Sequence, residues 1–360
     1  CGKKKITKVM IVTDEGIRRL GLTSFLEKTL TENNISYCIY DRTVANPTIW
    51  NVEEARELYL TEGAQAIIAF GGGSSMDCAK AAGARIVKPH QSIQQMKGLL
   101  KVHKRLPLLI AIPTTAGTGS ETTLAAVITD SEQHYKYPIN DFVLIPRYAV
   151  LDYHETVGLP ANITATTGMD ALTHAIESYI TPGAWAMSDM FELKAIEMIA
   201  VHLKAAVDNG SDPVAREAMS QAQYIAGMGF SNVGLGIVHS MAHPLGAHYD
   251  TPHGVANALL LPYVMEYNAA SPAAPKYVHI AKAMGVNTEG MSVEEGICAA
   301  IAAVRKLSLS IGIPQRLREI NVREEDLHQL AIDAFNDVCT GGNPRPTSVE
   351  DIEALYHKAF

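Results

Sequence analysis

The first 150 residues alternate between strand-like and helix-like segments, and this alternation restricts the possible folds more than any other feature of the chain. Short apolar runs predict strands, and a stretch with helical spacing follows each of the first three. The expected strands cover residues 8–13, 36–40, 66–70 and 108–112, and the expected helices cover residues 21–31, 52–61 and 76–87. Because strands that alternate with helices form right-handed crossovers, we predict a parallel sheet covered on both faces.

The pattern changes near Pro160, after which apolar residues recur with helical spacing and no strand-like run follows. The clearest example is the series Leu193, Ile196, Ile199, Leu203 and Val207. We therefore predict an α/β dinucleotide-binding domain at residues 1–158, followed by an all-helical, metal-binding domain at residues 159–360. Ligands commonly bind in the cleft between two such domains.

Composition narrows the classes of function. A chain of 360 residues with 47% hydrophobic content can bury the cores of two domains. The net charge of −8 without a basic cluster argues against nucleic acid, and the apolar runs are far shorter than the roughly 20 residues of a membrane span. Five scattered cysteines and the absence of an export signal favour the cytoplasm. Because the chain starts at Cys1 and not at methionine, we expect that a short piece precedes it.

Two turns rich in small residues follow predicted strands and can bind a dinucleotide. The first, Gly71-Gly72-Gly73-Ser74-Ser75-Met76-Asp77, leads into a helix whose first N–H groups can bind phosphate. Alone it is equally consistent with an ordinary connection. The second, Pro113-Thr114-Thr115-Ala116-Gly117-Thr118-Gly119-Ser120-Glu121, follows the fourth strand in the same way. Two such turns at the carboxyl ends of strands in one sheet favour a nucleotide site.

Asp14 follows the first strand, where the sequence has no GxGxxG motif. A carboxylate at this point can accept a hydrogen bond from a ribose hydroxyl group and would repel a 2′-phosphate, so Asp14 favours NAD over NADP. A plain role as helix N-cap is the alternative.

The placement of the histidines indicates a metal site. Asp170 and His174 are four residues apart and therefore share one face of a helix. Four further histidines lie within fifteen residues: His239, His243, His248 and His253. One carboxylate with several imidazoles is a ligand set for a divalent transition metal, and a satisfied polar core is the alternative. The spacing leaves open which of the four histidines bind.

These segments together resemble the iron-containing (group III) alcohol dehydrogenases, and the likeness is greatest to the lactaldehyde reductases, or 1,2-propanediol oxidoreductases. The resemblance covers essentially the whole chain. It rests on residues 71–74, 113–118, 168–174, 224–234, 239–254 and 339–343. It implies an NAD-dependent, metal-dependent enzyme that interconverts a small aldehyde and its alcohol, in the first place lactaldehyde and 1,2-propanediol. It also implies a homodimer.

The resemblance also implies roles for individual residues. It assigns metal coordination to Asp170, His174, His239 and His253, and it leaves His243 beside the metal as a proton relay. For the cofactor it points to Asp14, Asn46, Gly73, Ser74, Asp77, Thr114, Thr118 and Lys136. A cation held there would lower the pKa of the alcohol and polarise the carbonyl group, and the cofactor would carry the hydride.

Two departures from the family pattern affect these expectations. An N-terminal strand with a Phe-Gly-x-Gly-Ala turn is missing, which agrees with a piece preceding Cys1. Shortly after the position of Glu121, the pattern of the lactaldehyde reductases is Thr-Ile-Asn-Tyr-Val, whereas this chain has Thr123-Leu124-Ala125-Ala126-Val127. Because a polar side chain is lost here, short alcohols such as ethanol, butanol or 1,3-propanediol remain alternative substrates. The ligand set suits iron(II), although intrinsic affinities favour zinc.

Two other classes of function remain as alternatives. A metal- and NAD-dependent lyase resembling dehydroquinate synthase would share the architecture. Its carboxylated, phosphorylated substrate requires basic residues, but residues 235–255 contain neither lysine nor arginine. A metal-binding protein without catalysis would leave both glycine-containing turns unexplained.

Overall fold

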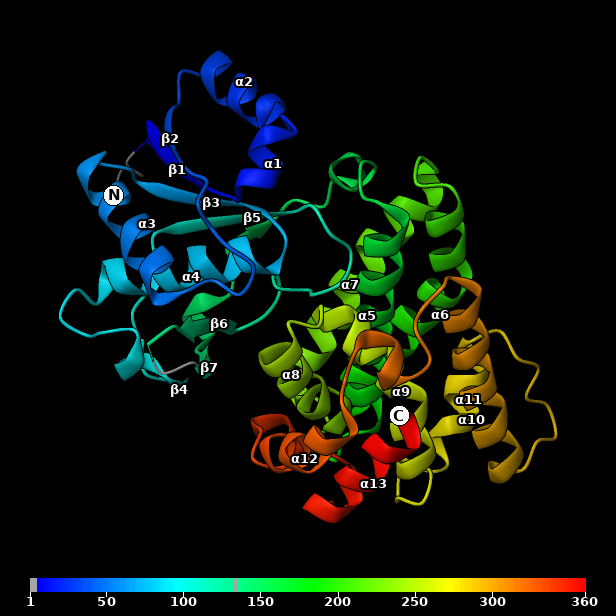
Figure 1. The fold of residues 1–360 in the computed structure, drawn as a ribbon. Coiled ribbons are helices and arrows are strands. Elements are labelled where there is room, and N and C mark those ends of the chain that lie inside the picture. Colours follow the sequence, from blue (N-terminus) through cyan, green and yellow to red (C-terminus); the bar gives the residue numbers. More distant parts are fainter. Residues whose placement is uncertain (1–4, 133–134) are drawn as a thin grey trace. The chain divides into compact units, whose positions relative to one another are not determined.

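The computed structural model describes residues 5–132 and 135–360, so the expectation about Cys1 falls outside the described residues (Figure 1). The chain divides into two compact units. We call residues 1–115 with 119–156 the α/β unit, and residues 116–118 with 157–360 the helical unit. No helix in the described part of the chain has both the length and the apolarity needed to cross a membrane.

Five parallel strands form the main sheet of the α/β unit, in the order β2-β1-β3-β5-β8. Their bounds are β1 (Lys8–Val12), β2 (Ser36–Tyr40), β3 (Ala66–Gly71), β5 (Leu108–Pro113) and β8 (Tyr148–Ala149). Alternate residues of β1 enter different apolar clusters: Met10 and Val12 pack on one face, and Val9 and Ile11 on the other. The predicted parallel sheet, buried on both faces, is thereby confirmed.

Four helices of this unit connect the strands: α1 (Glu15–Arg19), α2 (Ser24–Glu32), α3 (Ile49–Thr61) and α4 (Gly73–Val87). The prediction of a single helix at residues 21–31 was wrong at its start. Gly21, with a φ of +71°, separates α1 from α2, because a left-handed residue cannot continue a helix. Helix α4 begins three residues earlier than predicted, directly in the first glycine-containing turn.

A second, smaller sheet was not predicted. It has the order β4-β7-β6, with bounds β4 (Gly98–Leu99), β6 (Ala125–Asp130) and β7 (Tyr135–Asn140). Strands β6 and β7 pair antiparallel. In β6, Ala126 and Ile128 are buried while Val127 between them is exposed, which is the alternation of a strand with one buried face.

The helical unit contains no strand among its described residues, as predicted. Its helices are α5 (Ala161–Ile180), α6 (Ala186–Asp208), α7 (Pro213–Val233), α8 (Ile237–Tyr249), α9 (His253–Asn268), α10 (Lys276–Ala283), α11 (Val293–Ser310), α12 (Leu327–Phe335) and α13 (Val349–Ala359). Helix α5 packs against α6, α7 and α9 and is buried continuously from Gly168 to Ile180 (Figure 1). Polar side chains on that stretch therefore require partners inside the protein.

Candidate functional site

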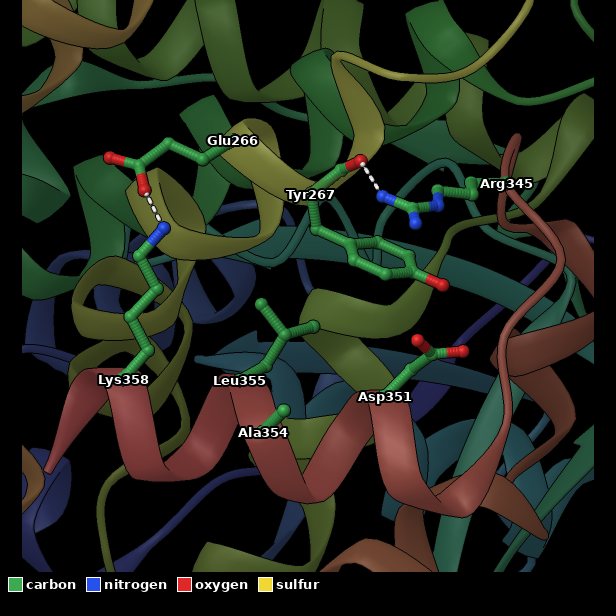
Figure 2. Close-up of a pocket in the computed structure, with 7 residues that line it drawn as sticks. All are labelled: Glu266, Tyr267, Arg345, Asp351, Ala354, Leu355 and Lys358. Carbon is green, nitrogen blue, oxygen red and sulfur yellow. Dashed lines mark hydrogen bonds and ion pairs between the residues drawn. The ribbon is translucent and has the colours of Figure 1, made fainter.

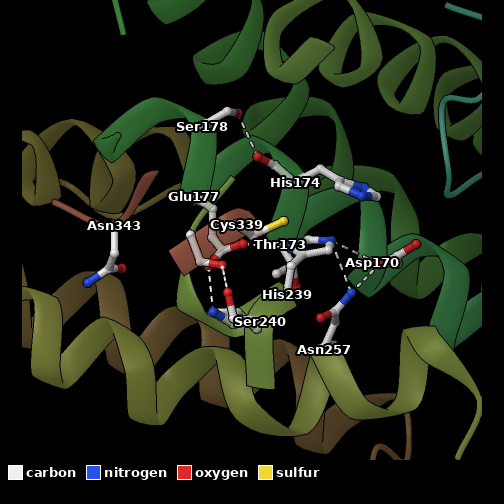
Figure 3. Close-up of polar contacts among 12 residues, drawn as sticks. Asp170, Thr173, His174, Glu177, Ser178, His239, Ser240, Asn257, Cys339 and Asn343 are labelled. Atoms are coloured by element: carbon white, nitrogen blue, oxygen red, sulfur yellow. Dashed lines mark hydrogen bonds and ion pairs between the residues drawn. The ribbon is translucent and has the colours of Figure 1, made fainter. Parts of the chain in front are cut away.

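The four candidate metal ligands converge in the helical unit, and Figure 3 shows three of them, Asp170, His174 and His239. Asp170 and His174 lie one turn apart on α5, His239 lies on α8, and His253 is the first residue of α9. One ligand atom from each of them lies within 4.8 Å of all the others. Nε2 of His239 is 3.9 Å and Nε2 of His253 is 3.7 Å from Oδ1 of Asp170. The spacing in the sequence left open which histidines lie beside Asp170 and His174, and the structure places His239 and His253 there.

A glycine allows α9 to approach α5 closely at this point. A Cβ atom on Gly254 would lie 2.5 Å from the carbonyl oxygen of Thr166, a distance that real Cβ atoms do not reach. Because the backbones meet here, His253 at the start of α9 lies over the carboxylate of Asp170. The imidazole of His253 is 43% exposed, whereas the other three candidate ligands are buried, so His253 is the member of the cluster that reaches the surface.

Burial and neighbouring charges shift the pKa values of Asp170 and His239 in the directions that favour metal binding. Burial opposes ionisation of Asp170, but the imidazoles of His174, His253 and His239 outweigh it and lower the pKa of this carboxyl group. Burial, together with the neighbouring imidazoles of His174, His253 and His243, holds the pKa of His239 well below its usual value. An ionised carboxylate and a neutral imidazole are the forms that bind a metal ion.

Asn257, one turn after His253 on α9, completes the polar cluster. Its Nδ2 lies 2.7 Å from Oδ1 of Asp170, 3.1 Å from Nε2 of His239 and 3.0 Å from Nε2 of His253. Its own Oδ1 is buried without a hydrogen-bond partner among the described residues, as is Nδ1 of His174. Buried polar atoms that lack partners, beside one carboxylate and three imidazoles, fit a divalent cation of the iron or zinc type.

Glu177 supports His239 from the side opposite the cluster. Its Oε2 lies 2.6 Å from Nδ1 of His239, and its Oε1 accepts a 2.6 Å hydrogen bond from the backbone N–H of Val238. Burial raises the pKa of Glu177 to about 7, although backbone N–H donors act in the opposite direction. Glu177 and Asn257 were not predicted from the sequence. The signal was their spacing from the candidate ligands, three residues after His174 and four after His253.

His243 lies one turn after His239 on α8 and is not a member of the four-residue cluster. Its Nδ1 is 2.8 Å from Oδ2 of Asp337, and its ring stacks on that of His253 at 5.5 Å between centroids. Burial opposes ionisation of Asp337, but His243 outweighs it and lowers the pKa of Asp337 to about 2. His248 points elsewhere, with Nε2 2.8 Å from Asp333.

The first glycine-containing turn, in the α/β unit, joins β3 to α4 through a glycine of positive φ. Gly71 adopts a φ of +150°, and a Cβ atom there would lie 2.6 Å from Oγ of Ser75. Gly72 caps α4 without any side-chain hydrogen bond, so backbone N–H groups in the first turn of α4 remain for a ligand. Gly73 and Ser74 are half-buried at this helix start.

Asp77 is held inside the α/β unit. Its Oδ1 accepts a hydrogen bond from Oγ of Ser120 at 3.0 Å, and its Oδ2 accepts one from the backbone N–H of Val127 at 3.1 Å. Buried Lys80, one turn further on α4, donates to Ser120, Thr123 and the carbonyl oxygen of Ala125. Burial lowers the pKa of Lys80 to about 8. Asp77 and Lys80 thus tie α4 to the second turn, which gives Asp77 a positioning role.

The other candidate cofactor residues are spread over both units. Asp14 caps α1, with its Oδ1 accepting from the N–H of Ile17 at 2.9 Å, which is the ordinary role that the sequence also allowed. Exposed Asn46 follows β2, buried Thr114 follows β5, and half-buried Lys136 lies on β7. Thr118 belongs to the helical unit, where a Cβ atom on the preceding Gly117 would lie 2.8 Å from the carbonyl oxygen of Thr167.

A surface pocket of about 270 Å³ lies between α9 and α13 of the helical unit (Figure 2). Its charged groups have partners within the protein. Lys358 pairs with Glu266, and Nη1 of Arg345 donates to the carbonyl oxygen of Tyr267 at 2.9 Å. The guanidinium group also lies over the Tyr267 ring, 3.9 Å from its centroid. None of the candidate ligands lines this pocket, so we assign it no part in the site.

Comparison with known proteins gives consistent results. The family of iron-containing alcohol dehydrogenases matches residues 1–153, and the C-terminal part of the Fe-containing alcohol dehydrogenase family matches residues 164–360. The chain is 48% identical to lactaldehyde reductase of Escherichia coli K12, over 98% of this chain and 92% of that protein. It is 40% identical to NAD-dependent methanol dehydrogenase of Bacillus methanolicus, over 98% and 92% of the two chains.

Solved structures agree. A 1,3-propanediol oxidoreductase superposes with a TM-score of 0.96 at 40% identity, covering 99% of this chain and 92% of that chain. A sulfoacetaldehyde reductase from Bifidobacterium kashiwanohense in complex with NAD⁺ superposes with a TM-score of 0.87 at 27% identity, covering 98% and 91%. The chain therefore belongs to the iron-containing alcohol dehydrogenase family of oxidoreductases.

Proposed function

We propose that this protein is an NAD-dependent, iron(II)-dependent dehydrogenase that interconverts lactaldehyde and 1,2-propanediol. The convergence of one carboxylate and three imidazoles within 4.8 Å, in a chain of this family, is the observation that carries the proposal. The 48% identity to lactaldehyde reductase supports the substrate. The relatives named above are dehydrogenases and reductases, which favours this proposal over the lyase alternative.

Asp170, His174, His239 and His253 would hold the cation, for which the family favours iron(II) and the imidazoles also suit zinc. When bound, the cation polarises the carbonyl oxygen of the aldehyde, and NADH supplies the hydride. Ionised Asp170 contributes one negative charge against a divalent cation, and neutral His239 offers a lone pair at Nε2. Partly exposed His253 leaves the cluster accessible to a small substrate.

For the cofactor, we propose that the first turn of α4 binds the pyrophosphate through its backbone N–H groups. Asp14, beside the end of β1, would accept a hydrogen bond from the ribose and disfavour NADP. Thr114, Thr118, Asn46 and Lys136 remain proposed contacts. The NAD⁺ complex of the sulfoacetaldehyde reductase and the NAD dependence of the methanol dehydrogenase support the choice of NAD.

His243 is proposed to move the proton. Its Nδ1 is held by Asp337, so its Nε2 is the nitrogen that can exchange a proton with the oxygen of the substrate. The stacked ring of His253 keeps the imidazole of His243 next to the cluster. With 42% of its side chain exposed, His243 can also exchange its proton with solvent.

A second candidate substrate class is a short alcohol other than a 1,2-diol, such as ethanol, butanol or 1,3-propanediol. Ala125 and Ala126 occupy the positions at which the pattern of the lactaldehyde reductases has an asparagine and a tyrosine, so this chain lacks a polar side chain there. Relatives named for methanol and 1,3-propanediol are 40% and 41% identical. From the family resemblance we further propose a homodimer, and from the scattered cysteines a cytoplasmic location.

The test is consumption of NADH by the full chain under anaerobic conditions with iron(II), with lactaldehyde, propanal and formaldehyde supplied separately. Lactaldehyde should give the highest kcat/KM. Higher kcat/KM for propanal would favour the second substrate class, and no turnover with any aldehyde would overturn the proposed function. Light scattering of the purified protein tests the dimer.

A further inference from the structure

Glu177 lies on the same face of α5 as two of the candidate ligands, seven residues after Asp170 and three after His174 (Figure 3). It is 2% exposed, and its Oε2 lies 2.6 Å from Nδ1 of His239. The opposite nitrogen of that ring, Nε2, faces the cluster at 3.9 Å from Oδ1 of Asp170. The imidazole of His239 therefore lies between the carboxyl group of Glu177 and the proposed metal site.

Above about pH 7 the carboxyl group of Glu177 is ionised and only accepts hydrogen bonds, so its contact with His239 then requires a hydrogen on Nδ1. In a neutral imidazole this leaves Nε2 with the lone pair. A second contact points the same way, because the amide Nδ2 of Asn257 is a donor and lies 3.1 Å from Nε2 of His239. We propose that Glu177 is a positioning residue that fixes the Nδ1–H tautomer of His239 and thereby makes Nε2 its metal-binding atom. This inference rests on the metal site proposed above.

The second carboxylate oxygen of Glu177, Oε1, also accepts hydrogen bonds, so a glutamine at this position could not make the same contacts. Backbone N–H groups at the start of α8, from Gly236, Val238 and His239, bind the carboxylate, with Val238 at 2.6 Å from Oε1. A Cβ atom on Gly236 would lie 2.9 Å from Oε1, so the glycine makes room for this contact. Donors thus face both oxygens of Glu177. A glutamine would have to direct its NH₂ group at one of them.

The two orientations of a glutamine have different consequences. If the NH₂ group faced His239, the imidazole would accept at Nδ1 and carry its hydrogen on Nε2, where no lone pair would remain for a cation. If the NH₂ group faced α8, the start of that helix would lose its acceptor, and α8 carries His239. Either orientation weakens metal binding, but only the first changes the tautomer.

A matched control is available in Glu192 on α6. It is fully buried like Glu177, and its carboxyl group packs against Gly229 of α7. Burial raises its pKa well above the usual value. Glu192→Gln makes the same chemical change in the same unit, at a carboxyl group that lies against α7 and not against His239.

The experiment measures Zn²⁺ affinity by competition with a chromophoric chelator, for the unsubstituted chain, Glu177→Gln and Glu192→Gln. Circular dichroism checks that each is folded. We expect Glu177→Gln to bind Zn²⁺ about 10–100-fold more weakly, the usual cost of losing the partner of a metal-binding histidine. Glu192→Gln should match the unsubstituted chain. Equal affinity of folded Glu177→Gln and the unsubstituted chain would overturn the inference.

A second measurement needs no substitution at Glu177. Nitrogen-15 spectra of histidine-labelled, metal-free full chain, in mildly alkaline buffer, report which nitrogen of His239 carries the hydrogen; His239→Ala identifies its signal. The inference predicts the Nδ1–H form, and the Nε2–H form would overturn it. This outcome is independent of turnover. If the chain showed the Nδ1–H form but bound no metal, the proposed function would be refuted, whereas the role of Glu177 in fixing the tautomer would still stand.

Discussion

Replacing His243 by alanine separates proton transfer from metal binding. His243 contacts Asp337 through Nδ1 and stacks on His253, but it lies outside the four-residue cluster. A positioned acid–base group contributes about 10²–10⁴-fold to a rate. Because the side chain of His243 is 42% exposed, water can take its place, and the lower limit applies. We expect kcat to fall by about 10²-fold, equivalent to roughly 2.7 kcal/mol.

The assay compares His243→Ala with His248→Ala. His248 is a close control because it lies on the same helix, is 43% exposed and also contacts an aspartate, Asp333, at 2.8 Å. Metal content, kcat and the pH–rate profile are measured for both. His243→Ala should keep its metal and lose one ionisation from the profile, whereas His248→Ala should resemble the unsubstituted enzyme. Loss of metal from His243→Ala would show that a ligand had been mistaken for a relay, and an unchanged kcat would refute the relay itself.

Three other predictions concern single residues. Replacing His239 by alanine should remove metal and activity together, because an incomplete ligand set binds weakly; metal analysis of the purified variant decides this. Asp14→Gly should raise kcat/KM with NADPH relative to NADH, because repulsion of a 2′-phosphate disappears; an unsubstituted enzyme that already used both cofactors equally would contradict it. Asp337→Asn should lower the free energy of unfolding by about 2 kcal/mol at neutral pH, because the pKa of Asp337 is about 2 in the folded protein and 3.8 ordinarily. That difference should be full above about pH 4 and vanish as the pH falls through about 2, so equal losses at pH 7 and at pH 3 in urea unfolding would contradict it.

Periodicity predicted the parts of the fold whose apolar residues repeat regularly. The strands of the main sheet are short apolar runs, and the face of α6 that includes Ile196, Ile199 and Leu203 is fully buried. The β6–β7 pair was missed because its alternation is weak. Ala126 and Ile128 are buried on one side of β6, but alanine carries little strand signal.

The site was predicted unevenly for a similar reason. Histidines and a nearby aspartate are rare enough in such spacing to indicate a metal site. Glu177 and Asn257 form no ligand pattern within their own helices. Their contacts join α5 to α8 and to α9, and both of these helices lie far from α5 along the chain. Asp337 lies 94 residues after His243. Such pairings depend on how helices pack, which the spacing within one segment does not contain.

The central claim is that the cluster of Asp170, His174, His239 and His253 holds the one cation on which turnover depends. The most direct measurement is an anaerobic titration of the metal-free full chain with iron(II), in which bound iron and the rate of NADH consumption with lactaldehyde are followed together. Both should rise in parallel and level off at one equivalent per chain. Full turnover before any iron is bound, or iron bound at one equivalent without turnover, would contradict the claim.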